Sequence, residues 1–309
     1  MARALDRAAS GISATTGVTA SACDLVVYVT AEVVKPEDAE AIAAGGPVLA
    51  VLNKADLVGS LSGRAGGEPM AAVRTRCANF SALVGVRMEP MVALLAVAAL
   101  DDLDSTLWAA LRTLAAHPGG ATCLDDSFSG FLAADIPVPT DVRLRLLDTL
   151  DLFGTALGIA ALRQGRTPPQ VRALLRRMSG VDAVLDKVRV VGAEVRYQRM
   201  LTAVAELEAA GVGQGRLGEE ITAFLSRDET VVARMADAVE LAEAAGLEVD
   251  PVDVDRDDPA AQLPRAARWQ RYSLGRLGPV SDLHRACGAD IVRGSLRLWS
   301  QGSLAGEPS

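Results

Sequence analysis

One short group of polar residues in this chain brings an amide, an amine and a carboxylate together within four positions. Asn53, Lys54 and Asp56 form the pattern Asn-Lys-x-Asp. A carboxylate at the last position can accept two adjacent N–H donors at once, in a charge-assisted bidentate hydrogen bond. The edge of guanine offers such a pair, its ring N–H and its exocyclic amino group. We therefore assign Asp56 as the residue that would recognise guanine.

The two residues before Ala55 have supporting roles in the same chemistry. The Asn53 amide both donates and accepts, so it can hold the loop and contact the edge of the base. The Lys54 side chain can lay its aliphatic stem over the ring while its ammonium group stays in water. The chain contains only two Asn and three Lys, so this pattern would rarely arise by chance. Turn formation alone is the weaker interpretation of Asn53 and Asp56.

Apolar runs predict the elements that would position this loop. Asp24–Thr30 and Pro47–Leu52 are β-branched, apolar stretches of the kind found in parallel strands covered on both faces. Between them, Pro36–Ala44 has Pro in its first turn and acidic residues near its start, which predicts a helix. The Asn-Lys-x-Asp group follows the second strand directly. Open α/β sheets bind ligands at that carboxyl end.

Further elements complete an alternating α/β pattern up to residue 116. We expect helices at Ala2–Ala9, Glu68–Leu83 and Ser105–Ala116, the last with Ser105 as its N-cap. Met91–Leu100 is short and apolar throughout, so periodicity cannot distinguish a buried strand from a buried helix. A turn before this run and an acidic cluster after it favour a strand.

Asp24–Leu57 resembles the carboxyl-terminal half of a P-loop GTPase domain of the translation-factor-like or Era-like kind. In that family a strand and a helix precede the Asn-Lys-x-Asp loop. The resemblance covers roughly residues 1–116. It implies a guanine nucleotide, GTP or GDP, as the ligand, with Asn53, Lys54 and Asp56 at the base.

The resemblance also implies another base-contacting loop after the next strand, usually Ser-Ala-Lys or Ser-Ala-Leu. Ser81-Ala82-Leu83 matches these letters, but the residues before it do not have the pattern of a strand. Ala98 and Ala99 follow the apolar run and are preferred. A backbone N–H group does the main work in that loop, so loss of the Ser hydroxyl is tolerable.

The chain lacks a phosphate-binding loop, because the pattern Gly-x-x-x-x-Gly-Lys-(Ser/Thr) does not occur in it. Such a loop supplies the N–H groups and the Lys that hold the β- and γ-phosphates. Mg²⁺ is therefore not expected, no catalytic residue or metal ligand is assigned, and the chain as given should be a poor GTPase. Two explanations stay open. The missing strand and loop lie upstream of Met1, or the domain is a degenerate pseudo-GTPase.

The remainder of the chain has a helical pattern. A break at His117–Gly120 predicts a domain boundary, with an incomplete GTPase-like α/β domain over residues 1–117 and an all-helical domain over residues 118–309. Asp250–Asp258 is expected to be an acidic linker. The expected helices are Asp141–Arg163, Thr167–Met178, Val181–Ala210, Gly218–Leu225, Asp228–Ala245, Pro259–Leu274 and Val280–Trp299.

Two smaller groups receive structural interpretations. His284 and Cys287 are three residues apart on an expected helix, but no further metal ligand lies near them in the sequence. Gly211–Gly218 contains several Gly residues but follows no strand, so it is expected to be a turn between two helices.

Composition limits the classes of partner. The net charge is −8 and there is no basic stripe, so nucleic acid is not expected as a partner. The four Cys residues have no CxxC spacing, which argues against a disulfide scaffold or a zinc site. No secretory signal is evident at Met1–Arg7, and no apolar run reaches the roughly 18 residues of a membrane span. We expect a cytoplasmic protein.

The sequence therefore predicts an incomplete or degenerate guanine-nucleotide-binding protein with a helical carboxyl-terminal domain. Dynamin-like proteins also place a helical trunk after a GTPase domain, and by that analogy a peripheral membrane contact is left open. A protein partner or homo-oligomer formed through the helical domain is left open too. The alternative is a non-catalytic helical interaction or scaffold protein that carries a pseudo-GTPase domain.

Overall fold

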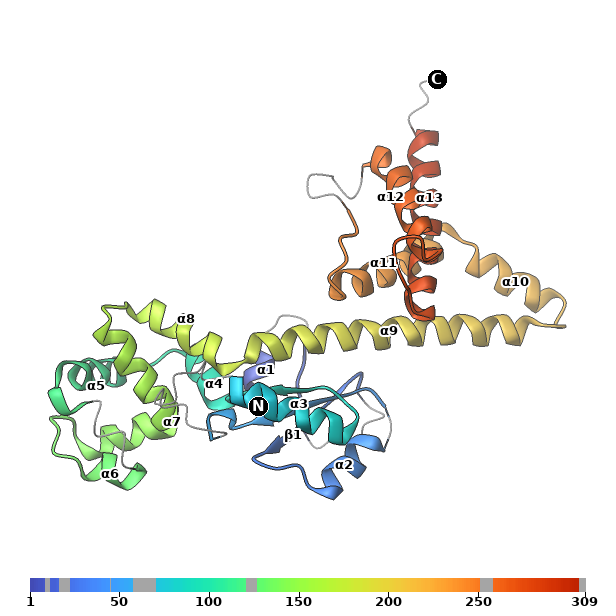
Figure 1. Cartoon of the computed structure of the whole chain (residues 1–309). Coiled ribbons are helices and arrows are strands. Elements are labelled where there is room, and N and C mark those ends of the chain that lie inside the picture. Colours follow the sequence, from blue (N-terminus) through green and yellow to red (C-terminus); the bar gives the residue numbers. More distant parts are fainter. Residues whose placement is uncertain are drawn as a thin grey trace. The chain divides into compact units, whose positions relative to one another are not determined.

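The structure is a computed structural model, and it describes residues 1–8, 12–16, 23–44, 46–57, 71–120, 127–250 and 258–305. The chain divides into two compact units, Met1–Val188 and Arg189–Ser309 (Figure 1). The boundary expected at residue 117 therefore does not separate the units, because residues 118–188 belong to the first. Of the acidic linker expected at 250–258, residues 251–257 lie outside the described residues.

The first unit contains a three-stranded sheet in the order β1-β2-β3. The strands are β1 (Val26–Ala31), β2 (Val48–Asn53) and β3 (Met88–Pro90), and both pairings are parallel. Helix α2 (Pro36–Ala43) connects β1 to β2. The two strands and the helix predicted around the Asn-Lys-x-Asp group are thus confirmed, with shifts of one or two residues at their ends.

Strand β2 lies at the centre of the sheet and of the packing around it. Its side chains alternate between the two faces, as they must in a strand. Ala50 and Leu52 join the larger apolar core, whereas Leu49 and Val51 join a second core on the other face. All four are at most 3% exposed. From Val48 to Leu52 the strand is apolar because helices cover both faces of the sheet.

The third strand is not where the sequence placed it. The apolar run Met91–Leu100 does not form a strand, because most of it belongs to helix α4 (Ala93–Asp101). Within this unit α4 lies between the sheet and a group of helices (Figure 1). Every residue of α4 except Leu94 is buried or partly buried, and a helix that is covered on most sides is apolar over most of its surface and shows little helical periodicity. The strand β3 precedes it, has three residues and includes Pro90, so it gave little signal.

Six further helices complete the described part of the first unit, and a seventh begins in it. Thr167 and Gln170 form a capping box at the start of α8. The N-cap of α5 is Asp104 rather than Ser105, because the Asp104 carboxylate accepts the Leu107 N–H at 2.9 Å. The bounds are α1 (Ala2–Ala8), α3 (Ala71–Val84), α5 (Ser105–Ala116), α6 (Phe128–Ala133), α7 (Thr140–Arg163), α8 (Pro168–Ser179) and α9 (Val181–Gly211).

Helix α7 is broken near its middle. Asp151 has φ 59° and ψ −179°, outside the helical region, so two helical segments meet there. The Asp151 carboxylate accepts the N–H of Leu152 at 2.7 Å, and the Thr155 hydroxyl donates to the Asp151 carbonyl at 2.7 Å. Side chains therefore satisfy the backbone groups that the break leaves without helical partners.

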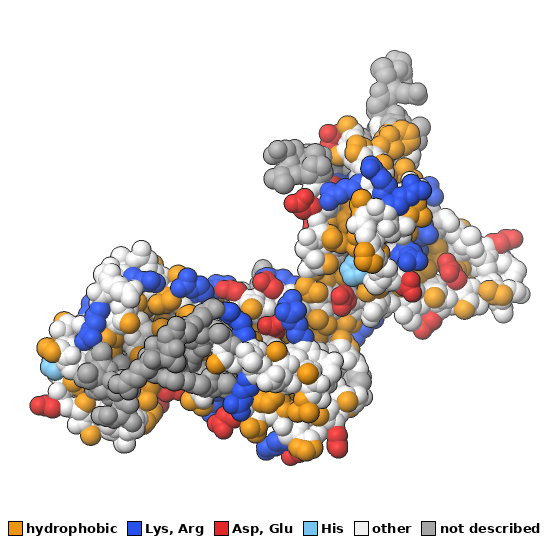
Figure 2. All heavy atoms as spheres, in the orientation of Figure 1, with side chains coloured by type: hydrophobic (Ala, Val, Ile, Leu, Met, Phe, Trp, Pro, Cys, Tyr) orange, Lys and Arg blue, Asp and Glu red, His pale blue; other side chains and the backbone are white. Residues whose placement is uncertain are grey.

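The described part of the second unit is all-helical. After the greater part of α9 it contains α10 (Arg216–Leu225), α11 (Asp228–Ala244), α12 (Pro259–Ser273) and α13 (Asp282–Ala305). The predicted helices are confirmed, and so is the turn between α9 and α10. In the core, Trp269 and Tyr272 stack edge to face with ring centroids 5.0 Å apart. Hydrophobic side chains also reach the surface of both units (Figure 2).

A buried ionic cluster links three helices of the second unit. The Asp290 carboxylate on α13 is 3% exposed and accepts hydrogen bonds from the Tyr197 hydroxyl at 2.8 Å and from the Arg234 guanidinium at 2.8 Å. Arg293 reaches the same carboxylate at 2.9 Å. Burial and the Asp290 charge raise the pKa of Tyr197, so its hydroxyl remains a donor.

The close approach of α4 and α7 requires Gly154. A Cβ atom at this position would lie 2.3 Å from Cδ2 of Leu95, which is fully buried, and 3.1 Å from Cβ of Leu150. We expect Gly154→Ala to lower the free energy of unfolding by about 1–3 kcal/mol, the usual cost of overpacking. Gly158→Ala, one turn along the same helix, meets its nearest atom at 3.3 Å and should change stability by less than about 1 kcal/mol. Denaturant unfolding followed by circular dichroism compares the two, and an equal effect would contradict the packing.

Removal of the carboxylate at the centre of the ionic cluster should be costly. Asp290→Ala leaves the largely buried Arg234 without its counter-ion, and we expect a loss of about 3–5 kcal/mol in unfolding free energy. Asp282→Ala is the matched control on the same helix, because the Asp282 side chain is fully exposed and its ion pair with Arg285 spans 3.9 Å. That control should be close to neutral in the same denaturation experiment.

Candidate functional site

The carboxyl ends of the three strands meet at one edge of the sheet. In the register of the sheet, Ala31 of β1 is opposite Asn53 of β2, and Leu52 of β2 is opposite Pro90 of β3. The segments that follow the strands therefore leave the sheet side by side. The Asn-Lys-x-Asp segment lies in the middle position, between the segment after β1 and the segment after β3.

Asn53 connects this segment to the one after β3. Its side-chain oxygen Oδ1 accepts the N–H of Ala93, the first residue of α4, at 3.1 Å. Two backbone hydrogen bonds lie beside it, from Met91 N–H to the Leu52 carbonyl at 2.9 Å and from Ala55 N–H to the Met91 carbonyl at 3.2 Å. Asn53 thus holds the loop in place, which is one of the two roles assigned to it from the sequence.

Lys54 forms a sharp turn at the end of the strand. Its φ is 55°, in the left-handed region that residues other than Gly seldom adopt, and the residue is exposed. A single 3₁₀ turn follows at Ala55–Leu57, with a hydrogen bond of 3.0 Å from Leu57 N–H to the Lys54 carbonyl. Asp56 is the middle residue of this turn.

Asp56 lies in an environment that disfavours its charge. The residue is half-buried, and desolvation raises the pKa of its carboxyl. The negative charge of Asp151, at the break in α7, raises the pKa further, whereas the backbone N–H of Asp56 and the charge of Lys54 act in the opposite direction. A carboxylate kept partly dry beside a like charge is a common feature of binding and catalytic sites. It would gain from any ligand that offers two N–H donors.

The structure does not place Ala98 and Ala99 in a loop. Both residues are buried inside α4, at 2% and 6% exposure, and their N–H groups belong to the helix. The Ala99 carbonyl accepts two hydrogen bonds from the Arg172 guanidinium, at 3.1 and 3.3 Å. Ala98 and Ala99 were preferred because Met91–Leu100 was expected to be a strand. Most of that run is helical, so the prediction of a base-contacting loop at these residues is wrong.

The competing group, Ser81-Ala82-Leu83, lies in the last turns of α3. The Ser81 hydroxyl donates to the Cys77 carbonyl at 2.7 Å and accepts the N–H of Met88 at 2.8 Å. Ser81 therefore ties the end of α3 to β3. It does not follow a strand, so it also lies outside the segment where the resemblance expects the second loop.

The segment after β3, which sequence reasoning missed, consists of Met91 and Val92 before α4 begins at Ala93. Val92 N–H donates to the Ser179 carbonyl at 2.8 Å, and Ala93 N–H donates to Asn53. The strand before this segment has three residues and includes Pro90, so the sequence carried little signal for its position.

His284 and Cys287 do not share a ligand position. The His284 ring pairs with the Ser281 hydroxyl at 2.9 Å. Cys287 is fully buried and donates its thiol to the Ala238 carbonyl at 3.1 Å. Burial raises the pKa of this thiol to about 12. It therefore stays protonated at neutral pH and is a poor metal ligand.

The chain was compared with models of protein families, with curated proteins and with solved structures, and none of them matches. Within the described ranges, no three His, Cys, Asp or Glu side chains are grouped as a metal site requires. No helix in that part of the chain combines the length and the apolar character needed to cross a bilayer.

The raised pKa of Asp56 has a consequence for stability. Between the ordinary Asp pKa and the raised folded value the unfolded chain ionises more readily than the folded one, so stability falls as the pH rises through this interval. At neutral pH the charge of Asp56 therefore costs folding free energy. We expect Asp56→Asn to raise the melting temperature at pH 7, by an amount that shrinks as the pH falls towards the ordinary Asp pKa.

Asp38→Asn is the control with the opposite sign. The Lys35 backbone N–H and the Tyr28 hydroxyl lower the pKa of Asp38, so its charged form stabilises the fold above the ordinary Asp pKa. This variant should melt below the wild type at pH 7 and approach it in acid. Thermal unfolding from pH 3 to 8 measures both variants, and a fall in melting temperature for Asp56→Asn at pH 7 would contradict the electrostatic argument.

Proposed function

We propose that the first unit is the guanine-recognition end of a GTPase-like domain and that it binds the guanine base through Asp56. The observation that carries the proposal is the position of Asn53-Lys54-Ala55-Asp56, directly after the central strand of a parallel sheet. Open α/β sheets bind ligands at this edge. The Asn53 hydrogen bond to Ala93 supports it, because it fixes the loop without using Asp56.

The electrostatics of Asp56 also favour a ligand with paired donors. The Asp56 carboxylate is already partly desolvated in the folded chain, so a ligand that covers it removes less water from it. A guanine edge would supply two N–H groups to the two oxygens in a charge-assisted pair. Adenine presents an acceptor in place of the ring N–H, so the same carboxylate would repel it. The site is thus expected to distinguish the two purines.

The phosphates should add little to this binding. The chain lacks the Gly-rich loop and Lys that hold the β- and γ-phosphates in P-loop proteins. Affinity then comes from the base alone, and we expect a dissociation constant on the order of 1 mM, corresponding to about −4 kcal/mol. Guanosine, GDP and GTP should bind within about threefold of one another. GTP hydrolysis is not part of the proposal for this chain.

Ligand-observed NMR with guanosine, adenosine and xanthosine at pH 7 tests the proposal. The wild type should bind guanosine and not adenosine. Asp56→Asn should weaken guanosine binding at least about tenfold and favour xanthosine. The reason is that a carboxamide can accept the ring N–H and donate to the carbonyl that replaces the amino group of guanine. No binding to either protein, or equal binding of adenosine, would contradict the proposal.

The second candidate is a non-catalytic interaction or scaffold protein in which the α/β part binds no nucleotide. The observation that favours it is an unfilled cleft among the helices of the second unit, lined by residues of α9, α10, α11 and α13. Absent guanosine binding, together with an assembly formed through these helices, would support this candidate over the first.

A further inference from the structure

The hairpin formed by α12 and α13 carries a local positive charge in an acidic chain. The two helices pack against each other and are joined by a turn over residues 274–281. From Arg268 to Arg285 the sequence contains four Arg and one Asp, whereas the whole chain has a net charge of −8. In Figure 2, Arg and hydrophobic side chains lie next to one another over these two helices. The charge of the whole chain therefore does not describe this surface.

The turn itself exposes two large apolar side chains. Leu274 and Leu277 are 61% and 60% exposed. The Arg276 N–H donates to the Arg271 carbonyl at 2.9 Å, and Gly275 between them has φ 70°, which is the Schellman ending of a helix. Such an ending often pairs two hydrophobic side chains, but Arg271 and Arg276 occupy those positions here. The motif fixes the backbone of the turn and leaves both Leu side chains in solvent.

The Arg side chains of this turn are available to an external anion. Among the described residues, Arg268, Arg271 and Arg276 form no ion pair with a carboxylate. Arg285 pairs with Asp282 over 3.9 Å, and the Asp282 side chain is fully exposed. An exposed ion pair of this length contributes little and is readily exchanged. The turn therefore combines exposed apolar surface with positive charge that the chain itself does not neutralise.

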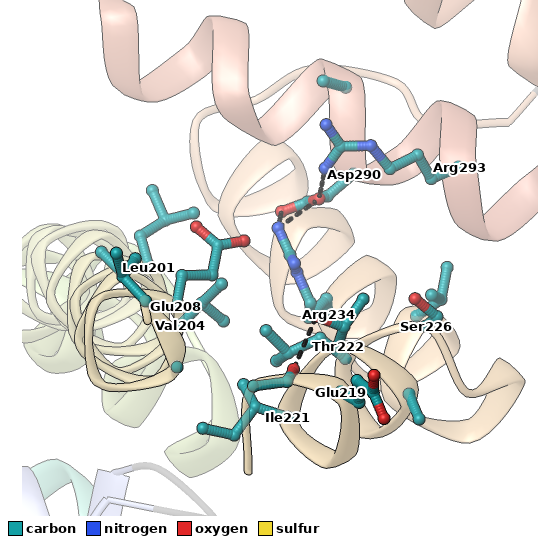
Figure 3. Close-up of a pocket in the computed structure, with 18 of the residues that line it drawn as sticks. Leu201, Val204, Glu208, Glu219, Ile221, Thr222, Ser226, Arg234, Asp290 and Arg293 are labelled. Carbon is teal, nitrogen blue, oxygen red and sulfur yellow. Dashed lines mark hydrogen bonds and ion pairs between the residues drawn. The ribbon is translucent and has the colours of Figure 1, made fainter. Parts of the chain in front are cut away.

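The turn between α9 and α10 is a contrasting case in the same unit. Val212 is 76% exposed there, but Glu208 and Glu219 line the same cleft as Val212 (Figure 3). The Arg234 guanidinium at the base of this cleft is already paired with Asp290. Exposed apolar surface at that turn is thus accompanied by acidic groups and by a neutralised cation, so it would not attract an anionic partner.

A bilayer with anionic headgroups is the partner that fits the turn between α12 and α13. A small ligand or a peptide is normally held in a concave site, and no residue of the turn 274–281 lines the cleft of the second unit. Exposed Leu side chains at the end of a hairpin can enter the boundary between headgroups and acyl chains. The neighbouring Arg side chains can extend to the lipid phosphates, which guanidinium groups bind through paired N–H donors.

We propose that the turn between α12 and α13 docks on membrane surfaces that carry anionic phospholipids. Leu274 and Leu277 enter the interfacial region of the bilayer, and Arg271 and Arg276 bind the lipid phosphates. The two contributions act together, because a small apolar anchor or a few basic residues alone give only weak binding to a membrane. The proposal concerns the second unit and does not depend on guanine binding by the first.

Flotation of the full chain with phospholipid vesicles tests the proposal. The wild type should bind vesicles of phosphatidylcholine with about one third phosphatidylserine, should not bind pure phosphatidylcholine, and should bind less as NaCl is added. Arg271→Gln combined with Arg276→Gln should lower the partition coefficient about 25-fold, because each Arg near an anionic surface contributes about fivefold. Leu277→Ser should lower it about tenfold through the loss of buried apolar area.

Leu277→Trp distinguishes insertion from attraction to the surface alone. Brominated lipid in the anionic vesicles should quench the fluorescence of this variant when it binds. The wild type is the reference, because its three Trp residues lie outside the turn and should be quenched much less. Binding of the variant without additional quenching would overturn the insertion of Leu277.

Val212→Ser and Arg216→Gln are the matched controls, because both residues are exposed and belong to the segment around the turn between α9 and α10. Both should bind vesicles like the wild type. Every substituted side chain is exposed, so circular dichroism should report a folded chain for all variants. A wild type that does not float with anionic vesicles would overturn the proposal, including the case in which it binds heparin or an acidic peptide instead. Equal binding to neutral vesicles, unchanged binding of the Arg and Leu variants, or loss of binding in the controls would overturn it as well.

Discussion

Strand β2 is the constraint on which the rest of the first unit depends. It pairs with a strand on each side, and its two faces belong to different apolar cores, so its position is fixed in every direction. The Asn-Lys-x-Asp segment at the end of β2 is therefore held in a defined position. A binding residue placed one turn beyond such a strand starts from a defined position, which reduces the ordering that a ligand would otherwise require.

The loop combines a rigid support with an unfavourable charge. Asn53 anchors it to α4, whereas Asp56 is held partly out of water and close to the charge of Asp151. A protein under selection for stability alone would not be expected to keep an acidic side chain there. Binding sites often carry such costs, because the same features that destabilise the free protein favour the ligand. This contrast supports the proposal that Asp56 is a recognition residue.

Local sequence patterns predicted the elements that have a clear periodicity. They failed for elements whose structure depends on how other parts of the chain pack around them. The strands β1 and β2 and the amphipathic helices of the second half have clear signatures, and the structure contains them. The prediction of a strand at Met91–Leu100 was wrong because helices and the sheet cover most of α4, which leaves little periodicity in its sequence. That error led to the choice of Ala98 and Ala99 as a base-contacting loop. The choice of Ser105 as N-cap was wrong by one residue, and Asp104 supplies the same chemistry.

The boundary at residue 117 and the surroundings of Asp56 could not be read from the sequence. A break rich in Gly and Pro looks the same within a unit as between units, and only the contacts of α5 and α4 with α7 and α8 show that residues 118–188 pack with the sheet. The proximity of Asp56 and Asp151 is a tertiary relation between residues far apart in the chain. Neither residue type nor spacing carries information about it.

The apolar character of both faces of β2 has a consequence for folding. In a strand that alternates between polar and apolar residues, a slip of one position is penalised at once, because polar groups enter the core. Val48 to Leu52 offers no such penalty, since every residue is apolar. Asn53 is the first polar position, and its amide reaches its Ala93 partner only when the strand is aligned correctly. The hydrogen bond of the Asn53 side chain therefore favours one register of β2 over the others while the sheet assembles.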